Sequence, residues 1–306
     1  MNETDSTLPP LLARITHPSM VADLSLADKQ ILATELRQTI IRTVAANGGH
    51  LAPSLGVVEL TLALLSVFDP EEDKLVWDVG HQSYAWKLLT GRSENFHTLR
   101  QLGGISGFPK IEESPFDHFG VGHSSTSVSA ALGMAMARDL AGKKNHVLAV
   151  IGDGSLTGGL AFEGLNQAGD MGRRLIVVLN DNEMSIAGDF GGMYGPLARL
   201  RASGGTAQPN LFNAFGLDYR YVEAGNDVSA LVAAFEEVRN IDHPVVVHIH
   251  TLKGAGYDGA GHVAGASSAS AGNVHELDPA VSDTGVRPTS NVLHSEPWHS
   301  DHCNLS

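Results

Sequence analysis

The stretch that decides the fold is residues 146–182, which read HVLAVIGDGSLTGGLAFEGLNQAGDMGRRLIVVLNDN. Two apolar runs of strand length, His146–Ile151 and Leu175–Leu179, enclose a helical segment at Gly159–Ala168. Continuous apolar runs of this length are typical of strands that are buried on both faces. A strand, a helix and a second strand in this order predict a βαβ unit in a parallel sheet.

Further periodic segments extend this unit in both directions. Apolar spacing predicts helices over 25–46, 57–68, 124–140 and 228–240, and strands over 74–79, 217–222 and 244–250. We therefore expect an α/β fold over residues 1–260, a doubly wound and mostly parallel sheet flanked by helices. Residues 261–306 are rich in Gly, Ala, Ser and Pro without sustained periodicity, so we expect a flexible tail or linker there.

Composition and charge exclude some classes of function. The net charge of -14 argues against nucleic acid as a partner, because binding the phosphate backbone needs a clustered basic face. The apolar runs are far shorter than the ~20 residues of a membrane helix, so we expect no membrane association. A polar N-terminus and a single cysteine, Cys303, favour a cytoplasmic location.

Polar residues follow both strands of the central unit. Gly152-Asp153-Gly154-Ser155 comes directly after the first strand, and Asn180-Asp181-Asn182 follows the second. The carboxyl ends of parallel strands form one ligand-binding edge, so these two clusters should meet there. Carboxylate and amide oxygens suit Mg²⁺, which proteins commonly hold together with substrate phosphates. The glycines and the start of the helix after Thr157 suit a bound diphosphate.

Two other interpretations of this segment stay open. Asp153-Gly154 could be a simple turn in which the aspartate caps a helix. A dinucleotide site is a second alternative, but the G-x-G-x-x-G pattern fails at Thr157 and the next strand ends in Asn180, not in an acidic residue that would bind a ribose.

Several motifs together resemble 1-deoxyxylulose-5-phosphate synthase, a family of thiamine diphosphate enzymes, over about residues 10–260. These motifs are Gly152-Asp153-Gly154 with Asn180–Asn182, Gly48–Ala52, Trp77–Gln82, Leu89–Arg92, Gly122–Ser127 and Leu179–Ile186. The resemblance implies the thiamine diphosphate-binding fold, with thiamine diphosphate and Mg²⁺ as cofactors. It also implies a transferase of isoprenoid biosynthesis that decarboxylates pyruvate and transfers a two-carbon unit to glyceraldehyde 3-phosphate.

The resemblance also assigns roles to individual residues. Asp153, Asn182 and the backbone carbonyl of Met184 would ligate Mg²⁺. His50, His81 and His123 would be catalytic, since imidazoles can move protons near neutral pH. The residues expected to contact the cofactor are His81, Gly122, His123, Ser124, Ser125, Gly152, Asp153, Gly154, Ser155, Asn182, Met184, Ile186 and Lys253.

Histidines elsewhere have simpler interpretations. Any one of the three histidines could merely satisfy loop backbone groups, and the case for catalysis rests on their occurring together in family-like motifs. His248 and His250 alternate with apolar residues on a strand, which favours packing. His294, His299, His302 and Cys303 lie in the expected tail with poor spacing for a metal site.

The chain also departs from the family pattern. The family enzyme is about twice this length, and its second domain grips the aminopyrimidine ring and supplies a glutamate. We therefore expect a separate pyrimidine-binding subunit, a dimeric core, and a sugar phosphate or 2-keto acid as substrate. A transketolase-type subunit acting on ketose phosphates and a non-catalytic fragment are the alternatives.

Overall fold

A five-stranded sheet forms the centre of the molecule. The computed structural model describes residues 8–183 and 191–257. The strands are β1 (Lys74–Trp77), β2 (Val147–Gly152), β3 (Ile176–Asp181), β4 (Asp218–Val222) and β5 (Val245–His250). They lie in the order β1-β2-β3-β5-β4, and every pair is parallel. The predicted parallel sheet is confirmed, and each strand lies within two residues of its expected position.

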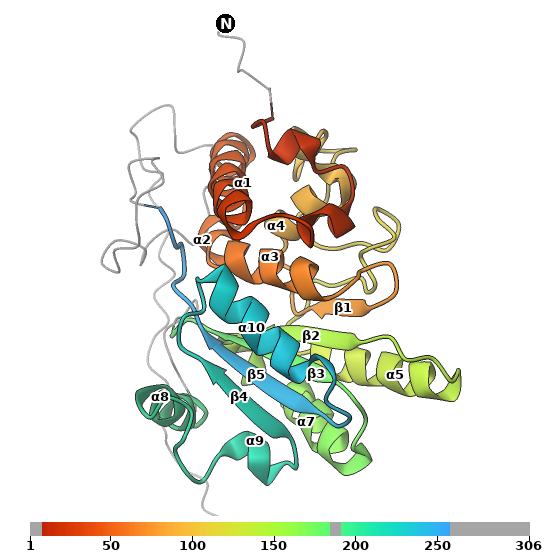
Figure 1. Cartoon of the computed structure of the whole chain (residues 1–306), viewed down its shortest axis with the longest axis vertical. Helices are drawn as coiled ribbons and strands as arrows, with labels where there is room; N and C mark the ends of the chain where they lie inside the picture. The colour runs from red at the N-terminus through yellow and green to blue at the C-terminus, as the bar shows by residue number, and fades with distance from the viewer. Residues whose placement is uncertain (1–7, 184–190, 258–306) are drawn as a thin grey trace, which may run out of the picture.

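Helices cover both faces of this sheet (Figure 1). Buried side chains of α1, α3 and α10 pack on one face against strand residues such as Leu148, Val150 and Ile176. Buried side chains of α5, α7 and α8 pack on the other face against their neighbours in the same strands, such as Ala149, Ile151 and Val177. Successive strand residues point to opposite faces, so a continuous apolar run supplies both cores. This arrangement is the doubly wound architecture that the sequence predicts.

The longer helices agree with the sequence pattern. They are α1 (Leu26–Asn47), α3 (Val58–Val67), α5 (Ser127–Leu140), α7 (Gly159–Met171) and α10 (Val228–Arg239). The Ser25 side chain caps α1 by accepting the N–H of Asp28, and Gly48, with φ +75°, follows its last residue. Asp227 caps α10 in the same way through the N–H of Ala230.

Shorter helices lie between these elements and were not predicted. They are α2 (Leu51–Leu55), α4 (Tyr84–Lys87), α6 (Asp153–Leu156), α8 (Tyr194–Ala202) and α9 (Leu211–Ala214), with a π turn at Leu88–Arg92 and 3₁₀ turns at Leu12–Arg14, Pro18–Val21 and Phe96–Thr98. Apart from α8, these elements have only three to five residues, which are too few to show a helical period in the sequence. The expected tail, with its histidines and Cys303, lies outside the described residues.

No long apolar helix is present in the described ranges. Across residues 8–183 and 191–257, none of the helices combines the length and the apolar character that crossing a bilayer requires.

Candidate functional site

The two predicted metal-binding side chains leave the sheet from adjacent strands. Gly152 at the end of β2 pairs with Asn180 of β3, so Asp153 and Asn182 follow paired strand ends at one edge. Asp153 is 2% exposed and Asn182 is half-buried. Asp153 is the first residue of α6, and Gly152 occupies the N-cap position of that helix. The N-cap position of α7 is Gly158, so neither helix is capped by a side chain. The interpretation of Asp153 as a helix-capping residue is therefore wrong.

A buried aspartate with no predicted role, Asp78, holds the loop before α5 at this edge. Asp78 follows β1 and is fully buried. Its Oδ1 accepts the N–H of Ser125 at 2.8 Å, and its Oδ2 accepts the N–H of Ser127 at 3.0 Å. These bonds hold Ser125 at φ +71° and delay the start of α5 to Ser127, three residues later than predicted. A carboxylate near the end of the predicted strand 74–79, just before Gly80, was the signal that could have identified Asp78.

The histidines fall into two groups. His50 precedes α2 and His81 follows β1, and their rings contact each other edge-on with centroids 5.9 Å apart. Phe108 lies against His50, with ring centroids 5.6 Å apart. His123 is exposed, and its Nδ1 lies 2.8 Å from the carbonyl of Ser124. The structure therefore brings His50 and His81 together, and in the described part of the chain no ring contact joins His123 to them.

The segment after β5 reaches the same edge. The Thr251 hydroxyl donates to Oδ1 of Asn180 at 2.5 Å, and its N–H donates to the carbonyl of Asp181 at 2.9 Å. The N–H of Gly254 donates to the carbonyl of Ala52 in α2 at 2.9 Å. Lys253, between these two anchors, is 7% exposed. The predicted lysine is thus buried at the edge that holds the strand ends and the start of α2.

Gln82 crosses from the β1 side to β3 and has an unsatisfied donor. The Asn180 Nδ2 donates to Oε1 of Gln82 at 3.1 Å, and the bond from Thr251 fixes the orientation of the Asn180 amide. Gln82 is 2% exposed, and its Nε2 has no hydrogen-bond partner among the described residues. Buried polar groups are nearly always bonded, so this donor indicates a ligand or a water molecule at the edge.

Asp181 belongs to a buried polar network that also was not predicted. Its Oδ2 lies 2.9 Å from Nε2 of His248 and forms an ion pair with Arg201 of α8, while its Oδ1 accepts the N–H of Glu183 at 3.1 Å. The Tyr219 hydroxyl lies 2.7 Å from Nδ1 of His248. His248 is fully buried, as packing requires, but it also contacts these polar groups, because β5 lies between β3 and β4 and brings them together.

Electrostatics stabilise the charges of this network. Burial alone would raise the pKa of Asp181, but the hydrogen bond from His248 and the charge of Arg201 hold it below its ordinary value. Burial by itself lowers the pKa of the Arg201 guanidinium. The negative charges of Asp181, Glu183 and Asp153 have the larger effect and raise this pKa overall. Burial, followed by the charge of Asp181, raises the pKa of Tyr219, so its hydroxyl stays protonated beside Nδ1 of His248.

The residues present fit a diphosphate and a divalent ion. A Cβ added to Gly152 would meet only the carbonyl of Asn180, at 3.9 Å, and one added to Gly122 would meet nothing within 4 Å, which leaves room for a ligand. Asp153 and Asn182 offer the hard oxygen atoms that Mg²⁺ prefers. Met184 and Ile186 lie outside the described residues. Among those described, no three His, Cys, Asp or Glu side chains form a metal-binding group, so an ion here would need amide, backbone and ligand oxygens besides the Asp153 carboxylate.

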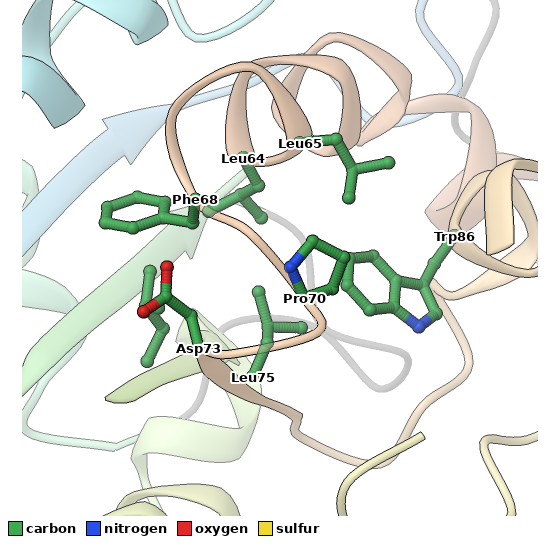
Figure 2. A pocket seen from close by; sticks show the side chains of 8 residues that line it. Leu64, Leu65, Phe68, Pro70, Asp73, Leu75 and Trp86 are labelled. Atoms are coloured by element: carbon green, nitrogen blue, oxygen red, sulfur yellow. The ribbon is translucent and has the colours of Figure 1, made fainter. Parts of the chain in front are cut away.

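A small void elsewhere is unsuited to a ligand. Leu64, Phe68 and Trp86 line it together with Asp73, beneath α3 (Figure 2). Its volume of about 10 Å³ has room for at most one water molecule. This void is part of the packing between α3 and β1 and not a candidate active site.

Comparison with solved structures places the fold among the transketolases. The transketolase from Leishmania mexicana superposes with a TM-score of 0.64 at 21% identity, covering 77% of this chain and 38% of that chain. The transketolase from Campylobacter jejuni superposes with a TM-score of 0.60 at 25% identity, covering 72% and 38%. The predicted α/β fold, of the thiamine diphosphate-binding type, is therefore confirmed.

Sequence comparison gives the family. The family model described as 1-deoxy-D-xylulose-5-phosphate synthase matches residues 12–208. The synthase of Nitratidesulfovibrio vulgaris strain DP4 is 57% identical over 290 residues, covering 83% of this chain and 45% of that protein. The synthase of Lawsonia intracellularis is 48% identical over 334 residues, covering 97% and 51%. The chain belongs to the 1-deoxy-D-xylulose-5-phosphate synthase family, and it spans about half the length of these relatives.

Proposed function

We propose that this chain holds the diphosphate and Mg²⁺ of thiamine diphosphate in a 1-deoxy-D-xylulose-5-phosphate synthase. The observation that carries the proposal is the register of β2 and β3, which puts Asp153 and Asn182 beyond paired strand ends. Family membership supports the synthase over a transketolase, because the transketolases share the fold at only 21–25% identity.

The ligands of the cofactor follow from this edge. Asp153, Asn182 and the backbone carbonyl of Met184 would hold Mg²⁺. The backbone of Gly152–Ser155 and the Gly122–Ser125 segment would line the diphosphate, with Lys253 compensating its charge. Gln82 Nε2, buried and unsatisfied in the described part of the chain, would donate to the bound group or to a water beside it.

His50 and His81 would act at the reacting carbon. Their rings contact each other, so the two imidazoles would act side by side. An imidazole can hold or deliver a proton near neutral pH. His123, which is exposed, would take part from the Gly122–Ser127 segment. Thiamine diphosphate would supply, when bound, the nucleophilic carbon and the electron sink that are needed to release CO₂ from pyruvate and to transfer the remaining two carbons to glyceraldehyde 3-phosphate.

A pyrimidine-binding domain from a second chain would complete the site, in an assembly with a dimeric core. The exposed position of His123 is consistent with a surface that another domain covers. Adding a candidate pyrimidine-binding chain to the purified protein should produce synthase activity. If the mixture binds the cofactor and yet turns over no pyruvate, the chain is a non-catalytic partner.

Calorimetry tests the binding site itself. We expect saturable binding of thiamine diphosphate that requires Mg²⁺, a loss of about tenfold or more in Asp153→Ala, and no loss in Asp170→Asn, whose side chain is exposed on α7. Unchanged affinity in Asp153→Ala would refute the proposal. Saturable binding of NAD that ignores Mg²⁺ would instead support the dinucleotide alternative.

A further inference from the structure

Two buried carboxylates stand at the ends of adjacent strands, and their surroundings differ. Asp153 follows β2, and Asp181 is the last residue of β3. Both are at most 2% exposed. A divalent ion at this edge is attracted to both, so something must decide which carboxylate binds it.

The protein itself engages both oxygens of Asp181. Oδ1 accepts the N–H of Glu183, and Oδ2 receives His248 Nε2 and the Arg201 guanidinium. Arg201 also lies 3.2 Å from Oε2 of Glu183, and its side chain is only 11% exposed. One arginine thus pairs with two acidic side chains, on either side of Asn182.

The proton arrangement in this network is determined by its hydrogen bonds. The Asp181 carboxylate can only accept, so Nε2 of His248 carries a proton and donates it to Asp181, which leaves Nδ1 of a neutral ring to accept from the Tyr219 hydroxyl. His248 and Arg201 approach Asp181 from β5 and α8, respectively. The chain leaving β3 is therefore held from two elements immediately before Asn182.

We propose that Arg201, oriented with His248 around Asp181, is a positioning residue that excludes Asp181 from the cation site and directs the ion to Asp153 and Asn182. Gly152 pairs with Asn180, so Asp153 and Asp181 each follow one member of this pair at the same edge of the sheet. This inference rests on the proposed Mg²⁺ and diphosphate site. Groups that orient or neutralise residues around metal ligands commonly change metal affinity about 10–100-fold when removed.

Calorimetry on the full chain separates this role from a merely structural one. Arg201→Gln should weaken Mg²⁺-dependent thiamine diphosphate binding about tenfold, because it leaves Asp181 as a competing buried charge. Adding Asp181→Asn to Arg201→Gln should restore affinity to within about threefold of the unmodified chain, since the competing charge is gone. Arg220→Gln, which removes an exposed ion pair with Glu237, is the matched control and should have no effect.

The single variant Asp181→Asn tests whether Asp181 is itself a ligand. Asp181→Asn alone should bind the cofactor almost normally, and a loss as large as that of Asp153→Ala would make Asp181 a ligand and overturn the inference. A double variant that binds no better than Arg201→Gln would also overturn it.

Hydrogen–deuterium exchange without cofactor tests the contact with Asp181 separately. Arg201→Gln should speed exchange at residues 180–183, and Arg220→Gln should not. Unchanged exchange in Arg201→Gln would refute the positioning role even if the cofactor binds. An unmodified chain that binds no cofactor, with exchange as expected, would instead refute the proposed function and with it the choice between the two carboxylates.

Discussion

The Ser125 hydroxyl donates a 2.7 Å hydrogen bond to the backbone carbonyl of Ser155. This bond joins two segments that lie far apart in the sequence and that both carry residues predicted to contact the cofactor. One segment precedes α5, and the other is the short helix α6 at the end of β2. The arrangement of the candidate site therefore depends on contacts between loops as well as on the order of the strands.

Gly158 should not tolerate a side chain, because Ser125 occupies the space beside it. A Cβ at this position would lie 2.0 Å from Oγ and 2.7 Å from Cβ of Ser125. We expect Gly158→Ala to lower the free energy of unfolding by about 1–3 kcal/mol in urea titrations. The double variant Gly158→Ala, Ser125→Gly should regain most of it, since glycine also accepts the positive φ of residue 125. Equal stability of the single variant and the unmodified chain would show that this contact is relaxed in solution.

Asp78→Asn should disrupt the loop before α5. Both oxygens of Asp78 accept backbone N–H groups, so an amide nitrogen would face one of these donors. We expect a loss of about 1–3 kcal/mol in the free energy of unfolding, together with faster hydrogen–deuterium exchange at residues 122–127. Asp170→Asn, on the exposed side of α7, serves as the control. Protection of residues 122–127 equal to that of the control would contradict the role given to Asp78.

Asp73 should make stability depend on acid pH. Burial by itself raises the pKa of Asp73, but hydrogen bonds from the His146 side chain and backbone and from the Asp69 N–H lower it overall. A folded pKa below the unfolded value of about 3.9 means that Asp73 stabilises the fold above that pH. This stabilisation is lost as the pH falls through the folded pKa.

Urea titrations at several pH values test this expectation. At pH 6, Asp73→Asn should be less stable than the unmodified chain by about 1–3 kcal/mol, and the difference should shrink below pH 4. Asp73 lies beside the void under α3 (Figure 2), whose apolar lining should be unaffected by pH. Glu72→Gln, at an exposed neighbouring position, should show no such trend. A difference that stays constant from pH 6 to pH 3 would refute the assignment.

Much of the fold follows from local patterns in the sequence. The runs 147–151 in β2 and 176–179 in β3 are continuously apolar because both faces of the sheet are covered, and their ends mark the edge with Asp153 and Asn182. The start of α5 was predicted too early. Asp78 accepts the N–H groups of Ser125 and Ser127, and the Ala-rich pattern of the helix carries no information about this distant residue.

The network around Asp181 could not be predicted for a different reason. His248, Tyr219 and Arg201 come from β5, β4 and α8, and their meeting depends on the insertion of β5 between β3 and β4. Strand order is a tertiary property that the separate strand patterns do not reveal. The helix that supplies Arg201, α8, was not predicted, because glycines at 191, 192, 195, 204 and 205 interrupt the apolar spacing around it.

The most direct test of the central claim locates the metal. Mn²⁺ takes the oxygen ligands that suit Mg²⁺ and scatters anomalously, so crystals grown with Mn²⁺ and thiamine diphosphate reveal the ion by its own signal. We predict one strong anomalous peak in contact with the Asp153 carboxylate and the Asn182 side chain, with the diphosphate bound to the same ion. A peak on Asp181 or Glu183, or ordered thiamine diphosphate with no ion at Asp153, would contradict the account.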